Sequence, residues 1–115
     1  MRYKHVFAIC AYKDSPYLEQ CIRSLKAQTV PSHIIICTST PSSYIDRLAW
    51  KYGLQVYVRQ GESNIKDDWN FAYSMAEGEL VTIAHQDDMY HRDYSAGLLL
   101  SLIHISEPTR PISIS

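Results

Sequence analysis

Hydrophobic residues are grouped along the chain in short blocks, and the spacing within each block indicates the element that it forms. Residues 6–11 and 34–37 are continuous apolar runs of strand length, residues 80–84 are apolar apart from Thr82, and residues 54–59 alternate apolar and polar positions. Such runs predict buried or half-buried β-strands. Between them, apolar residues recur every three or four positions at 18–28, 44–52 and 65–77, which predicts amphipathic helices, and a last helical stretch starts near His91.

Capping and turn residues mark the ends of these elements. Asp14, followed by Ser15 and Pro16, predicts the start of the first helix, because a capping side chain and an early proline both favour a helix N-terminus. Gly53 and Gly78 follow the second and third helical segments, where a helix end favours glycine. In the third helix we expect a buried apolar face made of Ile65, Trp69, Ala72, Tyr73 and Ala76.

The order of elements is β-α-β-α-β-α-β, followed by a helical stretch. This alternation with short loops predicts a parallel sheet covered by helices on both faces. Right-handed crossovers bring the carboxyl ends of the strands to one edge, which is where open α/β sheets bind ligands. We expect the fourth strand, residues 80–84, to be the last strand of the sheet on its side.

Length, charge and cysteine content limit the possible classes of protein. A chain of 115 residues has room for one domain, and its net charge of −1 gives no basic excess for nucleic-acid binding. The three cysteines form no C-x-x-C pair, so we expect buried thiols rather than a disulfide framework or a zinc site. No signal peptide and no apolar run of about 20 residues is present, which predicts a cytoplasmic protein and leaves peripheral membrane contact open.

The sequence His85-Gln86-Asp87-Asp88 directly follows the fourth predicted strand. Two adjacent carboxylates raise each other's pKa unless a positive charge neutralises them. A divalent cation that shares its remaining ligands with phosphates would do so. The alternative is a helix start in which Asp88 caps the next helix and Asp87 is solvated, and the dipeptide alone leaves both interpretations open.

Several common motifs are absent, and this excludes further classes of enzyme. The chain contains no G-x-x-x-x-G-K-[ST], no G-x-G-x-x-G and no G-x-S-x-G, so a P-loop nucleotidase, a dinucleotide dehydrogenase and an α/β-hydrolase are all disfavoured. The histidines do not have metal-site spacing, and we expect His5 and His33 at the surface. Asp67 and Asp68 suit a solvated first helical turn, where the helix dipole favours acidic groups.

Four segments of the sequence resemble a known family, glycosyltransferase family 2. Residues 6–14 (VFAICAYKD) look like its opening strand and turn, and residues 17–29 (YLEQCIRSLKAQT) match the helix that follows. Asn70 and residues 76–79 (AEGE) match a later helix, and residues 81–88 (VTIAHQDD) occupy the place of its strand and D-x-D motif. The resemblance covers about residues 5–97. It implies a Rossmann-like GT-A fold: three α/β/α layers around a mostly parallel sheet with strand order 3-2-1-4.

The family transfers a sugar from a nucleotide diphosphate sugar to an acceptor hydroxyl, usually with Mn²⁺ or Mg²⁺. The resemblance therefore implies a UDP-sugar as first candidate donor, a glycan or lipid-linked acceptor, and a role in bacterial cell-surface polysaccharide synthesis. It implies metal binding by His85, Asp87 and Asp88. The residues it implies in nucleotide binding are Ala11, Tyr12, Lys13, Thr38, Asp68, Asn70 and Gln86.

This chain also departs from the family pattern. His85 replaces the first aspartate of the D-x-D motif, and Trp69 replaces an arginine beside Asn70. Residues 37–39 (CTS) occupy the position where the family often has an aspartate that recognises the nucleobase of the donor. These departures leave the identity of the base and the sugar open.

The resemblance also predicts how the chain is divided. Residues 1–99 correspond to the donor-binding part, and the acceptor half with its catalytic base is expected beyond them. Residues 100–115 resemble a translated sequencing adapter, so we expect a non-native tail and a fragment that is inactive alone. The alternative is a non-catalytic α/β nucleotide-binding fragment or interaction module. A sugar nucleotidyltransferase is a weaker possibility, since residues 11–14 are not the glycine-rich basic loop that it would need.

Overall fold

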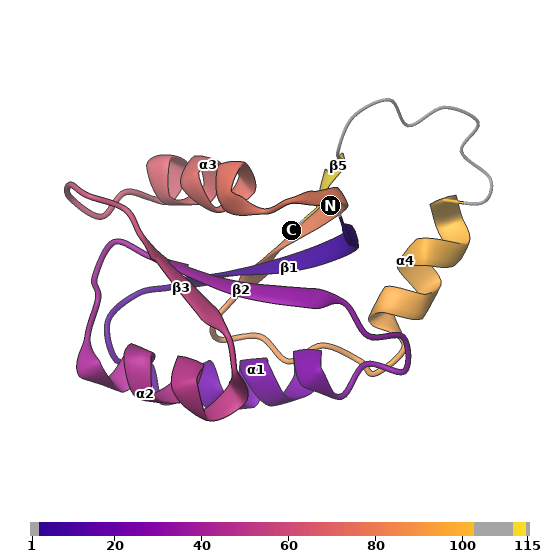
Figure 1. The fold of residues 1–115 in the computed structure, drawn as a ribbon, viewed down its shortest axis with the longest axis horizontal. Helices are drawn as coiled ribbons and strands as arrows, with labels where there is room; N and C mark the ends of the chain where they lie inside the picture. The colour runs from indigo at the N-terminus through magenta and orange to yellow at the C-terminus, as the bar shows by residue number, and fades with distance from the viewer. Residues whose placement is uncertain (1–2, 103–111, 115) are drawn as a thin grey trace.

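The structure is a computed structural model that describes residues 3–102 and 112–114. Strands and helices alternate along this part of the chain (Figure 1). The elements are β1 (Tyr3–Ala11), α1 (Leu18–Lys26), β2 (His33–Thr38), α2 (Ser43–Tyr52), β3 (Gln55–Val58), α3 (Ile65–Met75), β4 (Gly78–His85), α4 (Tyr94–Leu102) and β5 (Ile112–Ile114).

The strands form one parallel sheet in the order β3-β2-β1-β4-β5. This confirms the predicted parallel sheet and the order 3-2-1-4. The expectation that the fourth strand ends the sheet is wrong, because β5 pairs with β4 and places Ile112 opposite Leu80. An uncovered strand edge presents unpaired backbone groups, and a short extended segment satisfies them. β5 and the end of α4 fall within the segment 100–115 expected to be a tail, of which residues 103–111 and 115 lie outside the described residues.

Helices cover both faces of the sheet: α1 and α2 lie on one side, and α3 lies on the other (Figure 1). Alternate side chains of β1 pack on opposite faces of the sheet. Phe7 and Ile9 pack with the buried faces of α1 and α2, whereas Val6 and Ala8 pack in a second cluster with Ala72 of α3. A central strand buried on both faces explains why the sequence shows a continuous apolar run here.

The first two helices begin differently from one another. α1 starts only at Leu18 and has no side-chain cap, so the prediction that Asp14 caps it is wrong. The Asp14 carboxylate instead accepts a hydrogen bond of 2.7 Å from the Ser42 hydroxyl. Ser42 is itself the N-cap of α2 and accepts from the backbone N–H of Ile45, and Gly53 ends α2 in the left-handed conformation (φ 68°) as predicted.

Two expectations about burial need correction. On α3, Ala72 is buried, and Trp69 and the C-cap residue Ala76 pack half-buried against the same core cluster, as expected. Ile65, at 73% exposed, and Tyr73, at 36% exposed, do not belong to that buried face. His5, expected at the surface, is only 2% exposed. β1 carries it into the interior, where its two ring nitrogens make hydrogen bonds of 2.7 Å with the hydroxyls of Ser32 and Thr82.

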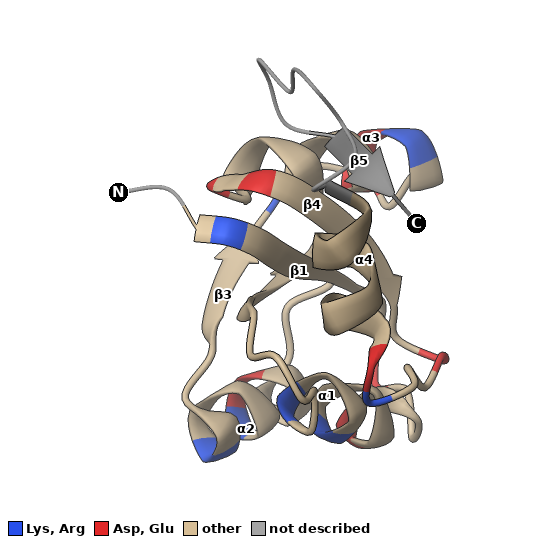
Figure 2. Ribbon diagram, turned by 90° about the vertical axis from the view of Figure 1, so that its right-hand side faces the viewer, with Lys and Arg blue, Asp and Glu red and all other residues tan. Residues whose placement is uncertain are grey.

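Charged residues lie mainly on helices, loops and strand ends, and lysines and arginines mark α1 and α2 (Figure 2). The helix layer formed by α1 and α2 carries Arg23, Lys26, Arg47 and Lys51 against two carboxylates, Glu19 and Asp46. Within the described part of the chain, none of the helices is long and apolar enough to cross a membrane.

Candidate functional site

A pocket of about 510 Å³ lies at the carboxyl ends of the first four strands. The loop between β3 and α3 and the first turns of α3 form one of its walls. It is lined by Cys10, Ala11, Tyr12, Cys37, Thr38, Arg59, Ser63, Asn64, Ile65, Asp68, Trp69, Phe71, His85, Gln86 and Asp87. The structure therefore brings a ligand-sized cavity to the predicted edge of the sheet.

Most of the residues expected at the site meet in this pocket. The lining includes Ala11, Tyr12, Thr38, Asp68, His85, Gln86 and Asp87. Lys13, Asn70 and Asp88 are not among the lining residues. The backbone N–H of Lys13 donates to the Thr40 hydroxyl at 2.6 Å, and the Lys13 ammonium lies 5.1 Å from the centre of the Tyr12 ring.

The acidic segment after β4 forms a tight turn at the pocket. The backbone N–H of Asp88 donates to the carbonyl of His85 at 3.1 Å, and the Asp87 carboxylate accepts a 3.1 Å hydrogen bond from the Ser15 hydroxyl. The His85 ring lies 5.1 Å from the Trp69 ring, centre to centre. Since α4 begins only at Tyr94, the alternative that Asp88 caps the next helix is wrong.

The donor atoms at this turn decide whether a cation fits. Among the described residues, no three His, Cys, Asp or Glu side chains come together to hold a metal ion. His85 and Asp87 both line the pocket and offer an imidazole and a carboxylate. Mg²⁺ commonly keeps several waters and binds through one or two carboxylates together with substrate phosphates. The donor set therefore fits a divalent cation whose other ligands come from a bound diphosphate and water.

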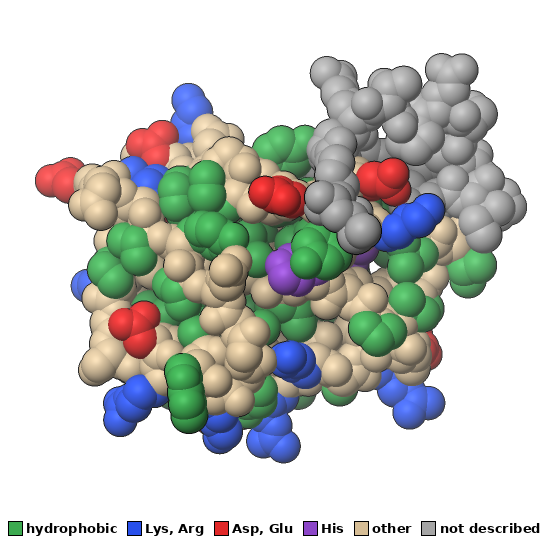
Figure 3. Space-filling model, viewed as in Figure 1, with side chains coloured by type: hydrophobic (Ala, Val, Ile, Leu, Met, Phe, Trp, Pro, Cys, Tyr) green, Lys and Arg blue, Asp and Glu red, His purple; other side chains and the backbone are tan. Residues whose placement is uncertain are grey.

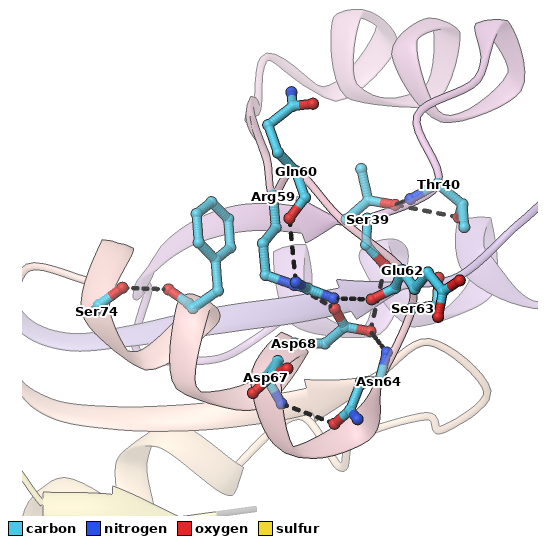
Figure 4. A network of polar contacts seen from close by, with 12 residues as sticks. Ser39, Thr40, Arg59, Gln60, Glu62, Ser63, Asn64, Asp67, Asp68 and Ser74 are labelled. Atoms are coloured by element: carbon cyan, nitrogen blue, oxygen red, sulfur yellow. Dashed lines mark hydrogen bonds and ion pairs between the residues drawn. The ribbon is translucent and has the colours of Figure 1, made fainter.

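Arg59 and Asp68 form an ion pair in the wall of the pocket (Figure 4). The Arg59 Nε donates to the Asp68 carboxylate at 2.8 Å, and the two side chains are only 16% and 22% exposed. The other Asp68 oxygen accepts from the Ser39 hydroxyl and from the backbone N–H of Asn64, at 3.3 Å each. Asp68 is thus not the solvated helix-start residue that its position suggested. Arg59 was missed, although its place directly after the third strand puts it at the same edge.

Two cysteines on adjacent strands contribute to the lining of the pocket. Cys10 and Cys37 are paired across β1 and β2, and both contribute to the lining. Burial raises the pKa of each thiol to about 12, and the Asp68 carboxylate adds to the effect at Cys10. Both thiols are therefore protonated near neutral pH, and they act as small apolar surface rather than as nucleophiles.

Comparison with known proteins identifies the family. The family model described as "Glycosyl transferase family 2" matches residues 6–104. The chain therefore belongs to glycosyl transferase family 2, as its motifs indicated. A search of curated protein sequences gave no match.

Two solved structures share the fold. The crystal structure of S. aureus TarS superposes with a TM-score of 0.73 at 21% identity, over 87% of this chain and 19% of that chain. The crystal structure of S. aureus TarS 1–349 gives 0.70 at 22% identity, over 87% of this chain and 32% of that chain. The similarity shows the GT-A fold, and this chain spans less than a third of the length of either protein.

Proposed function

We propose that this chain is the donor-binding part of a glycosyltransferase and that the pocket binds the nucleoside diphosphate of a nucleotide sugar, with UDP as first candidate. The observation that carries the proposal is the position of Asp87 in the lining of a cavity at the carboxyl edge of β1, β2 and β4. A volume of about 510 Å³ lies in the range of small-molecule sites. The half-exposed Tyr12 offers an aromatic face at this edge.

A bound Mn²⁺ or Mg²⁺ would neutralise the diphosphate and stabilise the charge that develops on it as the leaving group. In this proposal Asp87 is the main protein ligand, and the Ser15 hydroxyl holds its carboxylate in place. His85 is an auxiliary ligand whose ring is supported by Trp69. Asp88 lies outside the lining and contributes its charge.

Four of the implied nucleotide-binding residues divide into two groups. Ala11 and Thr38 end β1 and β2 at the pocket, where their backbones would approach the nucleotide. Lys13 and Asn70 are outside the lining, so a contact between them and the nucleotide would need a movement of their side chains.

Sugar transfer also needs a base within about 3 Å of the acceptor hydroxyl and a surface that orients the acceptor. We propose that residues beyond this chain provide both, so that these 115 residues bind the donor without transferring the sugar. In the whole protein the acceptor would be a glycan or a lipid-linked molecule of bacterial cell-surface polysaccharide synthesis. This part of the proposal rests on the family alone.

A contact with the inner face of the cytoplasmic membrane is part of the same proposal. Trp50 of α2 is 87% exposed, and lysines and arginines gather along the edge of the molecule formed by α1 and α2 (Figure 3). A tryptophan among basic residues suits the interface of an anionic membrane. Such a contact would hold the donor pocket near a lipid-linked acceptor.

Calorimetry of UDP binding, with and without Mn²⁺, tests the central proposal. We expect binding that depends on Mn²⁺ and a loss of at least tenfold in affinity in Asp87→Asn, because one hard ligand and one negative charge are removed. Asp46→Asn, the same change on the opposite helix layer, should leave the affinity unchanged. Absence of UDP binding to the unmodified chain would refute nucleotide binding. Equal affinity of Asp87→Asn and the unmodified chain would refute the metal assignment.

A further inference from the structure

We propose that Arg59 is a positioning residue for the donor pocket: it clamps the loop between β3 and α3 and neutralises the carboxylate of Asp68 in the pocket wall. The proposal rests on the proposed function for its effect on nucleotide affinity. Its effect on the loop is independent of any ligand.

One guanidinium holds three parts of this wall together (Figure 4). Its Nε donates to Asp68 on α3, one terminal nitrogen donates to the carbonyl of Gln60 at 3.2 Å, and the other donates to the carbonyl of Glu62. The backbone N–H of Arg59 also donates to the carbonyl of Thr38 at 2.8 Å, which anchors the residue to the end of β2. The clamp thus joins the loop and α3 to the rigid sheet.

Asp68 connects Arg59 to the start of α3. Its carboxylate accepts from the backbone N–H of Asn64 and from the Ser39 hydroxyl, at 3.3 Å each. Asn64 is the N-cap of α3 and accepts from the backbone N–H of Asp67. Because Arg59 fixes the carboxylate that holds Asn64, it acts on the cap of the helix that walls the pocket.

Charge gives the pair a second role. Arg59 is the only lysine or arginine among the described residues that line the pocket. The acidic residues in the same lining are Asp68 and Asp87. A nucleoside diphosphate is strongly anionic, so an unpaired Asp68 would oppose its binding. The pair is largely shielded from solvent, and its electrostatic effect is therefore larger than that of a pair in water.

Lysine cannot replace this arrangement fully. A guanidinium presents several donors in a fixed plane and can reach a carboxylate and two carbonyls together. A lysine ammonium retains the positive charge near Asp68 but lacks the planar fork. Arg59→Lys therefore separates the electrostatic role of the residue from its role as a clamp.

The test combines UDP affinity in the presence of Mn²⁺ with hydrogen exchange of the ligand-free chain. In Arg59→Gln we expect UDP affinity to fall about tenfold or more and the amides of Asn64, Asp67 and Asp68 to exchange faster. Arg59→Lys should retain most of the affinity and still exchange faster. The double variant Arg59→Gln/Asp68→Asn should regain part of the affinity, since the unpaired carboxylate is gone.

Arg47→Gln on α2 is the matched control and should change neither measurement. Unchanged amide exchange in both Arg59 variants would overturn the clamp. A double variant that binds UDP no better than Arg59→Gln would overturn the charge-neutralising role, because simple disruption of the wall would not be relieved by Asp68→Asn. If the unmodified chain binds no UDP, the proposed function fails, and the exchange measurement still decides whether Arg59 holds the loop.

Discussion

The side-chain amide of Gln86 pairs with both backbone groups of Tyr12: its oxygen accepts from the Tyr12 N–H and its nitrogen donates to the Tyr12 carbonyl, each at 3.0 Å. These bonds lie just beyond the last paired residues of β1 and β4, Cys10 and His85. The pair therefore ties two strand ends together at the mouth of the pocket. Gln86 acts on the shape of the site through Tyr12, because both of its polar atoms already have backbone partners.

Gln86→Glu should weaken this link selectively. The carboxylate can still accept from the Tyr12 N–H, but it loses the donor and faces the Tyr12 carbonyl. We expect the free energy of unfolding in urea to fall by about 1 kcal/mol and UDP affinity to fall several-fold. Gln20→Glu on the exposed face of α1 is the control, and equal stability of the two variants would contradict the account.

His85 and Asp87, the two proposed metal ligands that line the pocket, should differ in their effect on metal binding. In the presence of UDP, Asp87→Asn should reduce Mn²⁺ affinity more than His85→Ala does, since the carboxylate supplies both charge and a hard oxygen ligand. Electron paramagnetic resonance of free Mn²⁺ measures both affinities. A greater loss in His85→Ala would make the imidazole the main ligand.

His5 should make the stability of the fold depend on pH. Burial lowers the pKa of His5 to about 4, while an unfolded histidine titrates near 6.5. Below pH 6.5 the unfolded chain therefore binds a proton that the folded chain does not bind, and stability falls as the pH falls toward 4. We expect a loss of roughly 2 kcal/mol between pH 7 and pH 5 from this group.

Urea denaturation at the two pH values measures this difference. His5→Asn should lower stability at pH 7 but flatten the pH dependence. His33→Asn, a change of the same kind at a half-buried histidine that stacks on Tyr3, should leave most of the dependence in place. A dependence that survives unchanged in His5→Asn would show that His5 is not its source.

The proposed membrane contact predicts binding to anionic vesicles. The chain should sediment with phosphatidylglycerol vesicles and not with phosphatidylcholine vesicles, and Arg47→Gln should weaken this binding about fivefold, the effect of one basic charge near such a surface. The single variant Trp50→Ser should weaken vesicle binding more than Arg47→Gln does. Ile65→Ser, which removes an exposed apolar side chain at the pocket, is the control, and equal losses in the two serine variants would contradict a contact through α1 and α2.

The sequence predicted the sheet and its helices because burial on both faces leaves a direct trace in the chain. Residues 6–11 of β1 and 34–37 of β2 are unbroken apolar runs, and Gly53 marks the end of α2. It did not predict the burial of His5, because the hydroxyls that satisfy its ring belong to Ser32 and Thr82, which are distant in sequence. Single polar residues carry no local signal of such partners.

The candidate site likewise has features that the sequence predicted and features that it did not. The edge of the sheet and the residues of the acidic turn followed from strand order and from the family motifs. The pairing of Arg59 with Asp68, and the use of Ser42 rather than Asp14 as a helix cap, depend on how loops far apart in the chain meet. The pairing of β5 with β4 likewise depends on a sheet edge that local spacing cannot reveal.

The most direct test of the central claim is a nuclear magnetic resonance titration of the isotope-labelled chain with UDP and Mn²⁺, in which the paramagnetic ion broadens the signals of nearby amides. The account predicts that Mn²⁺ and UDP together broaden the amides of residues 85–88 and of Tyr12, and that Mn²⁺ alone at the same concentration leaves them sharp. Broadening that is the same without UDP, or that falls on residues away from the pocket, would contradict joint binding of nucleotide and cation at this site.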